Sequence, residues 1–85
     1  MPINPAKYNK ARDILAAAGS DSAKKSHPKH NTDNVPDDHG KSLLREARDE
    51  FRKKDVGKPA LKSEMLQAHY DAVHKAAGEM GIGSW

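Results

Sequence analysis

The stretch from Lys41 to Asp55 constrains the fold most, because its side chains separate into three sides when it is wound as a helix of about 100° per residue. The apolar side consists of Leu43, Leu44, Ala47 and Phe51. The second side, called the basic edge below, consists of Lys41, Arg45, Arg48 and Arg52. The third side consists of Glu46, Asp49 and Glu50. This pattern predicts an amphipathic helix over residues 41–55 that buries its apolar side.

The chain is short and poor in apolar residues, which limits the fold to a thin core. It has 85 residues, of which 35% are hydrophobic and 5% aromatic. A chain of this size buries a small fraction of its surface, so a layer of helices on helices is the expected maximum. Alternating runs of β-branched residues are missing. We therefore predict a single all-α domain of three helices over residues 1–85.

Two further helices are indicated on either side of residues 41–55. Asn4 followed by Pro5 is typical of a helix start and Gly19 of a helix end, which predicts a helix over residues 5–18. Pro59 opens the last helix, over residues 59–79, and the Gly-rich tail 80–85 follows it. The last helix has a broad apolar stripe that suits two neighbours: Leu61, Met65, Leu66, His69, Ala72, Val73, Ala76, Ala77 and Met80.

Buried side chains are expected both in the last helix and in the tail that follows it. His69 falls in the middle of the apolar stripe, so we expect it to be a core histidine hydrogen-bonded to a polar group; the alternative is a place on a partner-facing surface. Ile82 and Trp85, in the tail, are expected to fold back as a hydrophobic plug.

Residues 19–40 have a different composition. They hold two prolines, two glycines, three histidines and four aspartates, and Val35 is the one large aliphatic residue. Turn-forming residues dominate and no helical or strand period is visible. We predict a long polar loop rich in His and Asp, and connections of this length are usually functional or disordered.

The basic edge is the leading candidate for a binding surface. Arginine suits phosphate because its planar guanidinium can donate two parallel hydrogen bonds. Lys24, Lys25 and Lys29 are predicted to extend the patch from the loop. The alternative is a solvated helix face whose charges pair with nearby acids, and the net charge, 15 basic against 12 acidic residues or +3, permits both interpretations.

A metal site is a second candidate, because the loop gathers imidazoles and carboxylates. With no cysteine in the chain, a divalent ion such as zinc would need His, Asp or Glu ligands. The residues that could supply them are His27, His30, His39 and Asp37. Their spacing matches no strong metal-binding signature.

The same loop contains the residue types of a metal-dependent nuclease, found in some toxin domains. His27 or His30 would act as the base and Asn31 or Asn34 would orient it. That architecture needs a β-hairpin, which the flanking residues do not indicate. Nothing else in the chain suggests catalysis, so we expect a protein that is not an enzyme and has no resident cofactor.

The favoured hypothesis is therefore a small binding protein that engages nucleic acid or a nucleoprotein through the basic edge. The first alternative is a protein-interaction module such as a phage-type accessory protein, an inhibitor or a virion component, and the second is the nuclease or toxin domain. A small-molecule substrate is not expected, because so thin a core leaves little room for a large pocket. No apolar run is long enough to span a membrane and no secretory leader is visible, so we expect a cytoplasmic protein unless it is a processed toxin domain or a virion component.

Overall fold

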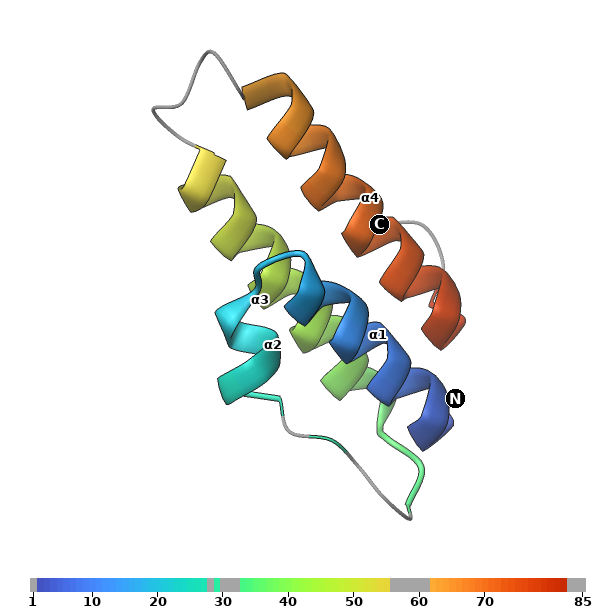
Figure 1. Cartoon of the computed structure of the whole chain (residues 1–85). Coiled ribbons are helices and arrows are strands. Elements are labelled where there is room, and N and C mark those ends of the chain that lie inside the picture. Colours follow the sequence, from blue (N-terminus) through green and yellow to red (C-terminus); the bar gives the residue numbers. More distant parts are fainter. Residues whose placement is uncertain (1, 28, 30–32, 56–61, 83–85) are drawn as a thin grey trace.

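The computed structural model is all-α, as predicted. It describes residues 2–27, 29, 33–55 and 62–82, without the side chains of residues 55 and 62–66. Four helices lie in the described ranges: α1 (Pro5–Ala17), α2 (Asp21–Lys25), α3 (Asp37–Asp55) and α4 (Lys62–Met80). Figure 1 shows α3 and α4 running antiparallel, with α1 lying along them and the short α2 next to α1 and α3.

Helix α1 begins and ends where the sequence predicts. The side chain of Asn4 accepts a hydrogen bond of 2.8 Å from the amide of Ala6, so it caps the first turn. Gly19 follows the helix with a φ of 106°, a backbone conformation that glycine adopts without strain. Tyr8, Ala11 and Leu15 form the buried face of α1.

The prediction of one long loop over residues 19–40 is wrong, because residues 21–25 and 37–40 are helical. Ser20 caps the short helix α2, with its hydroxyl accepting a 3.1 Å hydrogen bond from the amide of Ala23. Between the two helical ends, Val35 is buried and forms an isolated antiparallel bridge with Ile3. Contacts with other parts of the chain therefore order much of a segment that has no periodic pattern.

Helix α3 begins at Asp37, four residues earlier than predicted from residues 41–55. Gly40, interpreted as a loop residue, lies inside its first turns and is buried. A Cβ atom at this position would come within 2.5 Å of Cδ1 of Ile3 and 2.9 Å of Cδ1 of Ile82. The glycine is therefore explained by close packing of the two chain ends against α3.

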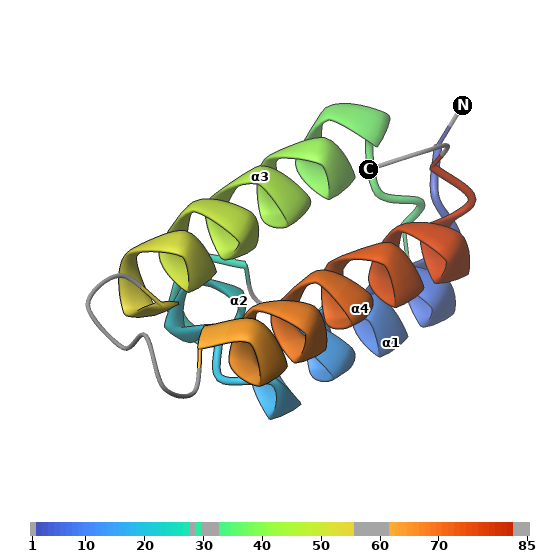
Figure 2. The same ribbon diagram turned by 90° about the horizontal axis from the view of Figure 1, so that it is seen from above.

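Helix α4 packs against both α1 and α3, whereas α1 and α3 touch over a much shorter stretch. Figure 2 shows α1 and α3 against different sides of α4, as its broad apolar stripe predicts. The small helix α2 contacts both α1 and α3. Helix α4 thus packs on both α1 and α3, and α2 bridges α1 and α3.

The burial of His69 and of Ile82 is confirmed, and Ile82 is one of the two residues of the predicted hydrophobic plug. His69 is buried and its ring stacks on Phe51, with centroids 4.1 Å apart and an angle of 11° between the planes. Ile82 is buried beyond Gly81, which leaves the helix with a φ of 72°. Trp85 and residues 59–61 lie outside the described residues, as do the side chains of Met65 and Leu66.

Candidate functional site

The basic edge lies on α3, and two of its residues, Arg48 and Arg52, are next to residues of α4. Arg45 and Arg52 are exposed and Arg48 is half-buried. Lys41 forms an ion pair with Asp37 one turn earlier, with its Nζ atom 3.1 Å from the carboxylate. The four residues of the basic edge thus lie on one helix as predicted, and they differ in exposure.

Two arginines of this edge line a pocket between α3 and α4. The pocket has a volume of about 170 Å³ and is lined by Arg48, Arg52, Tyr70, Val73 and His74. Residues four apart on a helix share one face, so α3 presents two arginines and α4 presents Tyr70 and His74 opposite them. Val73 is buried and closes the pocket toward the core. The arrangement combines two guanidinium groups, a phenol ring and an imidazole in one small space.

The pocket has the chemistry of an anion site with an aromatic wall. Guanidinium groups donate charge-assisted hydrogen bonds to phosphate or carboxylate oxygens. A tyrosine ring can stack on a flat ligand, and an imidazole can donate or accept a hydrogen bond. The sequence indicated the two arginines but not the two α4 residues. The missed signal is the spacing of four between Tyr70 and His74, on the face next to the apolar stripe.

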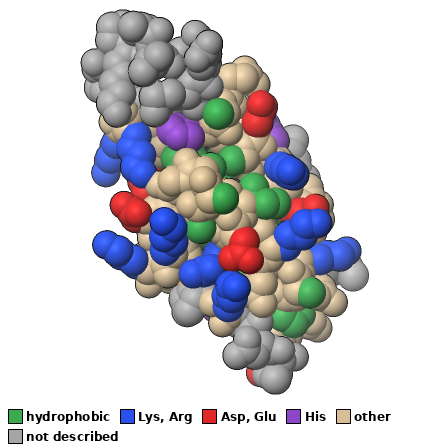
Figure 3. Space-filling model, in the orientation of Figure 1, with side chains coloured by type: hydrophobic (Ala, Val, Ile, Leu, Met, Phe, Trp, Pro, Cys, Tyr) green, Lys and Arg blue, Asp and Glu red, His purple; other side chains and the backbone are tan. Residues whose placement is uncertain are grey.

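The three loop lysines do not continue this edge. Lys24 and Lys25 lie in the last turn of α2, which packs on the other side of α3. Lys29 lies 3.7 Å from a carboxylate oxygen of Asp13 on α1. On the face shown in Figure 3, Lys and Arg side chains lie at separate places with Asp and Glu side chains between them.

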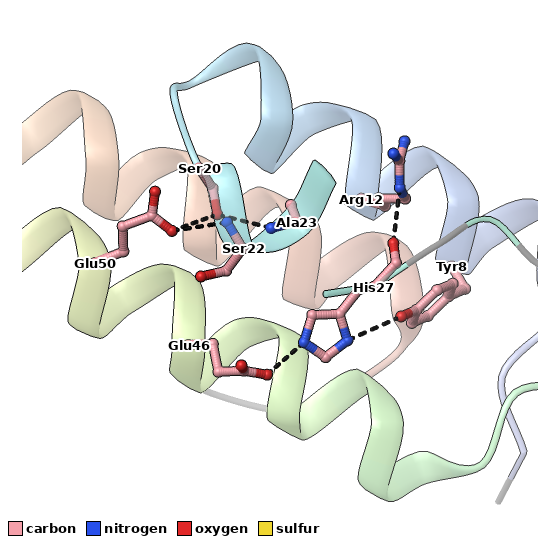
Figure 4. A network of polar contacts seen from close by, with 8 residues as sticks. All are labelled: Tyr8, Arg12, Ser20, Ser22, Ala23, His27, Glu46 and Glu50. Atoms are coloured by element: carbon pink, nitrogen blue, oxygen red, sulfur yellow. Dashed lines mark hydrogen bonds and ion pairs between the residues drawn. The ribbon is translucent and has the colours of Figure 1, made fainter. Parts of the chain in front are cut away.

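The opposite side of α3, called the acidic edge below, carries Glu46 and Glu50 and faces α2. The carboxylate of Glu50 accepts hydrogen bonds from the first residues of α2, as Figure 4 shows. The amides of Asp21 and Ser22 lie 2.6 Å and 3.0 Å from its oxygens, and the Ser20 hydroxyl lies 3.2 Å away. Glu50 therefore caps α2 from a different helix, and the acidic edge holds α2 in place.

These hydrogen bonds determine the charge state of Glu50. Burial alone would raise the pKa of this carboxyl group, but the hydrogen bonds from Ser22, Asp21 and Ser20 outweigh it and lower the pKa to about 2. Glu50 also forms an ion pair with Lys54, one turn later on α3, at 3.5 Å. Lys54 donates a further hydrogen bond to the carbonyl oxygen of Gly19. This end of α3 is thus bonded to the connection between α1 and α2.

Glu46 makes the second contact of the acidic edge, with His27 (Figure 4). The other ring nitrogen of His27, Nδ1, lies 3.4 Å from the hydroxyl of Tyr8, and the His27 carbonyl oxygen accepts a 2.8 Å hydrogen bond from Arg12. Burial raises the pKa of Tyr8, with Arg12 opposing this and Glu46 adding to it. His27 therefore links α1 and α3 through both sides of its ring.

The predicted metal ligands are not brought together in the described part of the chain. His27 uses both ring nitrogens within the protein, Asp37 pairs with Lys41, and His39 is exposed on the first turn of α3. No group of three or more His, Asp or Glu side chains there is placed to hold an ion. His30 lies outside the described residues, so a site that includes it stays a prediction.

The fold and the site define the chain as a small all-α protein with a basic, aromatic-walled pocket between two antiparallel helices. No protein-family model and no curated protein matches it. Among solved structures, the bacterial toxin phenomycin is similar, with 52% sequence identity and a TM-score of 0.76 over 99% of this chain and 92% of the phenomycin chain. This chain therefore belongs to the phenomycin family.

Within the described residues, no helix is both long enough and apolar enough to cross a membrane. The cytoplasmic location stays a prediction.

Proposed function

We propose that this protein is a toxin that acts by binding nucleic acid, alone or within a nucleoprotein, through the basic edge of α3. The toxin part of the proposal is supported by the similarity to phenomycin, which is described as a bacterial toxin. An identity of 52% over nearly the whole of both chains is the kind of relationship in which a biological role is commonly shared. The part that concerns nucleic acid has a separate basis, in the pocket.

The observation that carries this second part is the gathering of Arg48 and Arg52 with Tyr70 and His74 around one pocket. Binding to a nucleic-acid backbone is driven mainly by contacts between cations and phosphates, and arginine makes them with defined geometry. The acidic edge supports the same assignment, because Glu46 and Glu50 are bonded to His27 and to α2 on the far side of the helix. They therefore do not lie among the arginines of the pocket.

Toxicity is tested first. The protein is expressed in bacteria from a repressible promoter and, purified, is added to cultured animal cells, and growth is measured in both. Arrest of growth in at least one system is expected. Normal growth in both, with folded protein present inside the cells, would contradict the assignment as a toxin.

Binding is tested with the purified protein and fluorescent oligonucleotides. We expect Arg45→Glu/Arg52→Glu to weaken binding by about tenfold or more, since two exposed cations of the basic edge are reversed. The matched control is Lys7→Glu/Lys75→Glu, which changes the net charge by the same amount at exposed sites that do not line the pocket. Equal weakening by both variants would indicate a net-charge effect and remove the basic edge as the site.

A protein partner is distinguished by capture from lysate with and without nuclease treatment. Nucleic-acid binding predicts capture that nuclease abolishes and salt weakens. Capture that survives both treatments would point to a protein interface and overturn this proposal.

A further inference from the structure

We propose that the α3/α4 pocket binds one phosphate group of an unpaired nucleic-acid strand, with a neighbouring base stacked on Tyr70. This inference rests on the proposed function and defines which form of nucleic acid the site takes. It follows from the pocket's size, its aromatic wall and the line of cations that leads away from it.

The size of the pocket limits what can enter it. Pockets that hold whole drug-sized ligands measure about 300–1,000 Å³. This pocket, at about 170 Å³, suits a single group such as a phosphate. A ligand that is larger than the pocket must therefore continue outside it, along the surface of α3 or α4.

The basic edge offers a path for that continuation. From Arg52 to Lys41 it extends for about 16 Å along the helix, at about 1.5 Å per residue. Arg45 is exposed between the pocket and Lys41. A linear polyanion that places one phosphate between Arg48 and Arg52 can thus place further phosphates along the same side of α3.

Tyr70 provides the reason to favour an unpaired strand. Its side chain is half-buried in the pocket wall, on the helix opposite the two arginines. In a duplex both faces of each base are covered by its neighbours, whereas an unpaired base can stack on an aromatic side chain. Arginines with a tyrosine next to them are the combination by which proteins hold single strands, through charge and stacking together.

His74 and Val73 complete the site. His74 lies one turn beyond Tyr70 on α4, where its exposed imidazole can hydrogen-bond to a phosphate or to a base edge. Val73 supplies an apolar floor next to the Tyr70 ring. The site thus has distinct places for a charged group and for a flat ring.

The experiment compares three ligands of equal length by fluorescence anisotropy: a single-stranded oligothymidylate, the same strand in a duplex, and an abasic strand that keeps the phosphates and lacks the bases. The proteins are the wild type, Tyr70→Leu, Tyr70→Trp and Arg52→Gln, each checked for folding by circular dichroism. Leucine keeps an apolar side chain but cannot stack, and tryptophan stacks at least as well as tyrosine.

We expect Tyr70→Leu to weaken binding of the oligothymidylate by about 5- to 150-fold, the range for the loss of one stacked base. The same variant should leave binding of the abasic strand within about twofold, and Tyr70→Trp should retain wild-type affinity. Arg52→Gln should weaken the binding of oligothymidylate and abasic strand alike, because it removes a phosphate contact.

The outcomes separate this inference from the proposed function. If the wild type binds the strands and Arg52→Gln weakens binding, but Tyr70→Leu changes nothing or weakens the abasic strand equally, stacking on Tyr70 is overturned and the basic edge remains. Tighter binding of the duplex than of the single strand would also overturn the inference. If the wild type binds none of the three ligands, the proposed function fails with it.

Discussion

The two sides of α3 show how one helix can serve both the fold and a binding site. On the acidic edge, Glu46 and Glu50 bond to His27 and to the start of α2. On the basic edge, Arg48 and Arg52 line a pocket that faces α4. The charges of one edge thus connect segments of the chain, and those of the other surround a space that a ligand can fill. Whether a row of charged side chains stabilises the fold or binds a ligand therefore depends on which residues of other helices lie next to it.

The comparison predicts that substitutions on the acidic edge reduce stability and substitutions on the basic edge reduce binding. The largest effect is expected for Glu50→Ala. This change removes three hydrogen bonds to a carboxylate and leaves the Asp21 and Ser22 amides at the start of α2 without this acceptor. We expect a loss of about 2–3 kcal/mol in the free energy of unfolding, measured by urea denaturation.

The matched control is Asp49→Ala, the neighbouring and exposed acid of α3. It should change the free energy of unfolding by less than about 0.5 kcal/mol. An equal loss in the free energy of unfolding for Glu50→Ala and Asp49→Ala would show that α2 does not depend on Glu50. The structural role given to the acidic edge would then be wrong.

A pH dependence follows from the same carboxylate. Its pKa is about 2 in the folded protein against an ordinary value of 4.5, so the unfolded chain takes up this proton first as the pH falls. The stabilisation by ionised Glu50 is therefore complete above about pH 4.5 and is lost as the pH falls toward 2. Thermal melts at pH 5.5 and pH 3 should show a larger drop in Tm for the wild type than for Glu50→Gln. Equal drops would show that the Glu50 pKa is not lowered.

A smaller effect is expected for His27→Ala, which breaks the connection between α1 and α3. Its contact with Glu46 is partly exposed and the hydrogen bond to Tyr8 is long, so the expected loss is about 1 kcal/mol. Amide hydrogen exchange should also become faster in α2. His74→Ala removes a histidine that lines the pocket from α4 instead, and it should leave both stability and exchange near the wild type. A greater loss of stability for His74→Ala than for His27→Ala would contradict the assignment of His27 to the fold and of His74 to the binding site.

The smallest change in stability is expected for Arg52→Gln. Its side chain is exposed at the pocket, so the free energy of unfolding should stay within about 0.5 kcal/mol of the wild type in urea denaturation. A loss above about 1 kcal/mol would indicate that the basic edge, like the acidic edge, supports the fold.

Local patterns in the sequence predict the helical class, the start of α1 and the buried face of α4. Asn4, Pro5 and Gly19 act through the backbone next to them, so their effect can be inferred without a structure. The burial of His69 is also predictable, because it follows from its angle on the helix. The arginines of the basic edge are found in the same way, from spacings of three and four.

The features that sequence reasoning missed depend on contacts between distant residues. Helix α2 has five residues and is capped by Glu50, about thirty positions further along the chain. Gly40 resembles a loop residue until Ile3 and Ile82 are seen against it. Tyr70 and His74 join the two arginines only when the antiparallel packing of α3 and α4 is known. The period of a helix, read from the sequence, shows which residues share a face of that helix. Which faces of two helices come into contact is known only from their packing.

The central claim is that the basic edge binds phosphate, and the salt dependence of binding tests it most directly. The affinity of the wild type and of Arg45→Gln/Arg52→Gln for a single-stranded oligonucleotide is measured over a range of salt concentrations. For single strands, each phosphate contact contributes about 0.7 to the slope of log affinity against log salt. Loss of two contacts should therefore reduce the slope by about 1.4, while Lys7→Gln/Lys75→Gln leaves it unchanged. A slope that is the same in the arginine variant and the wild type would contradict the account.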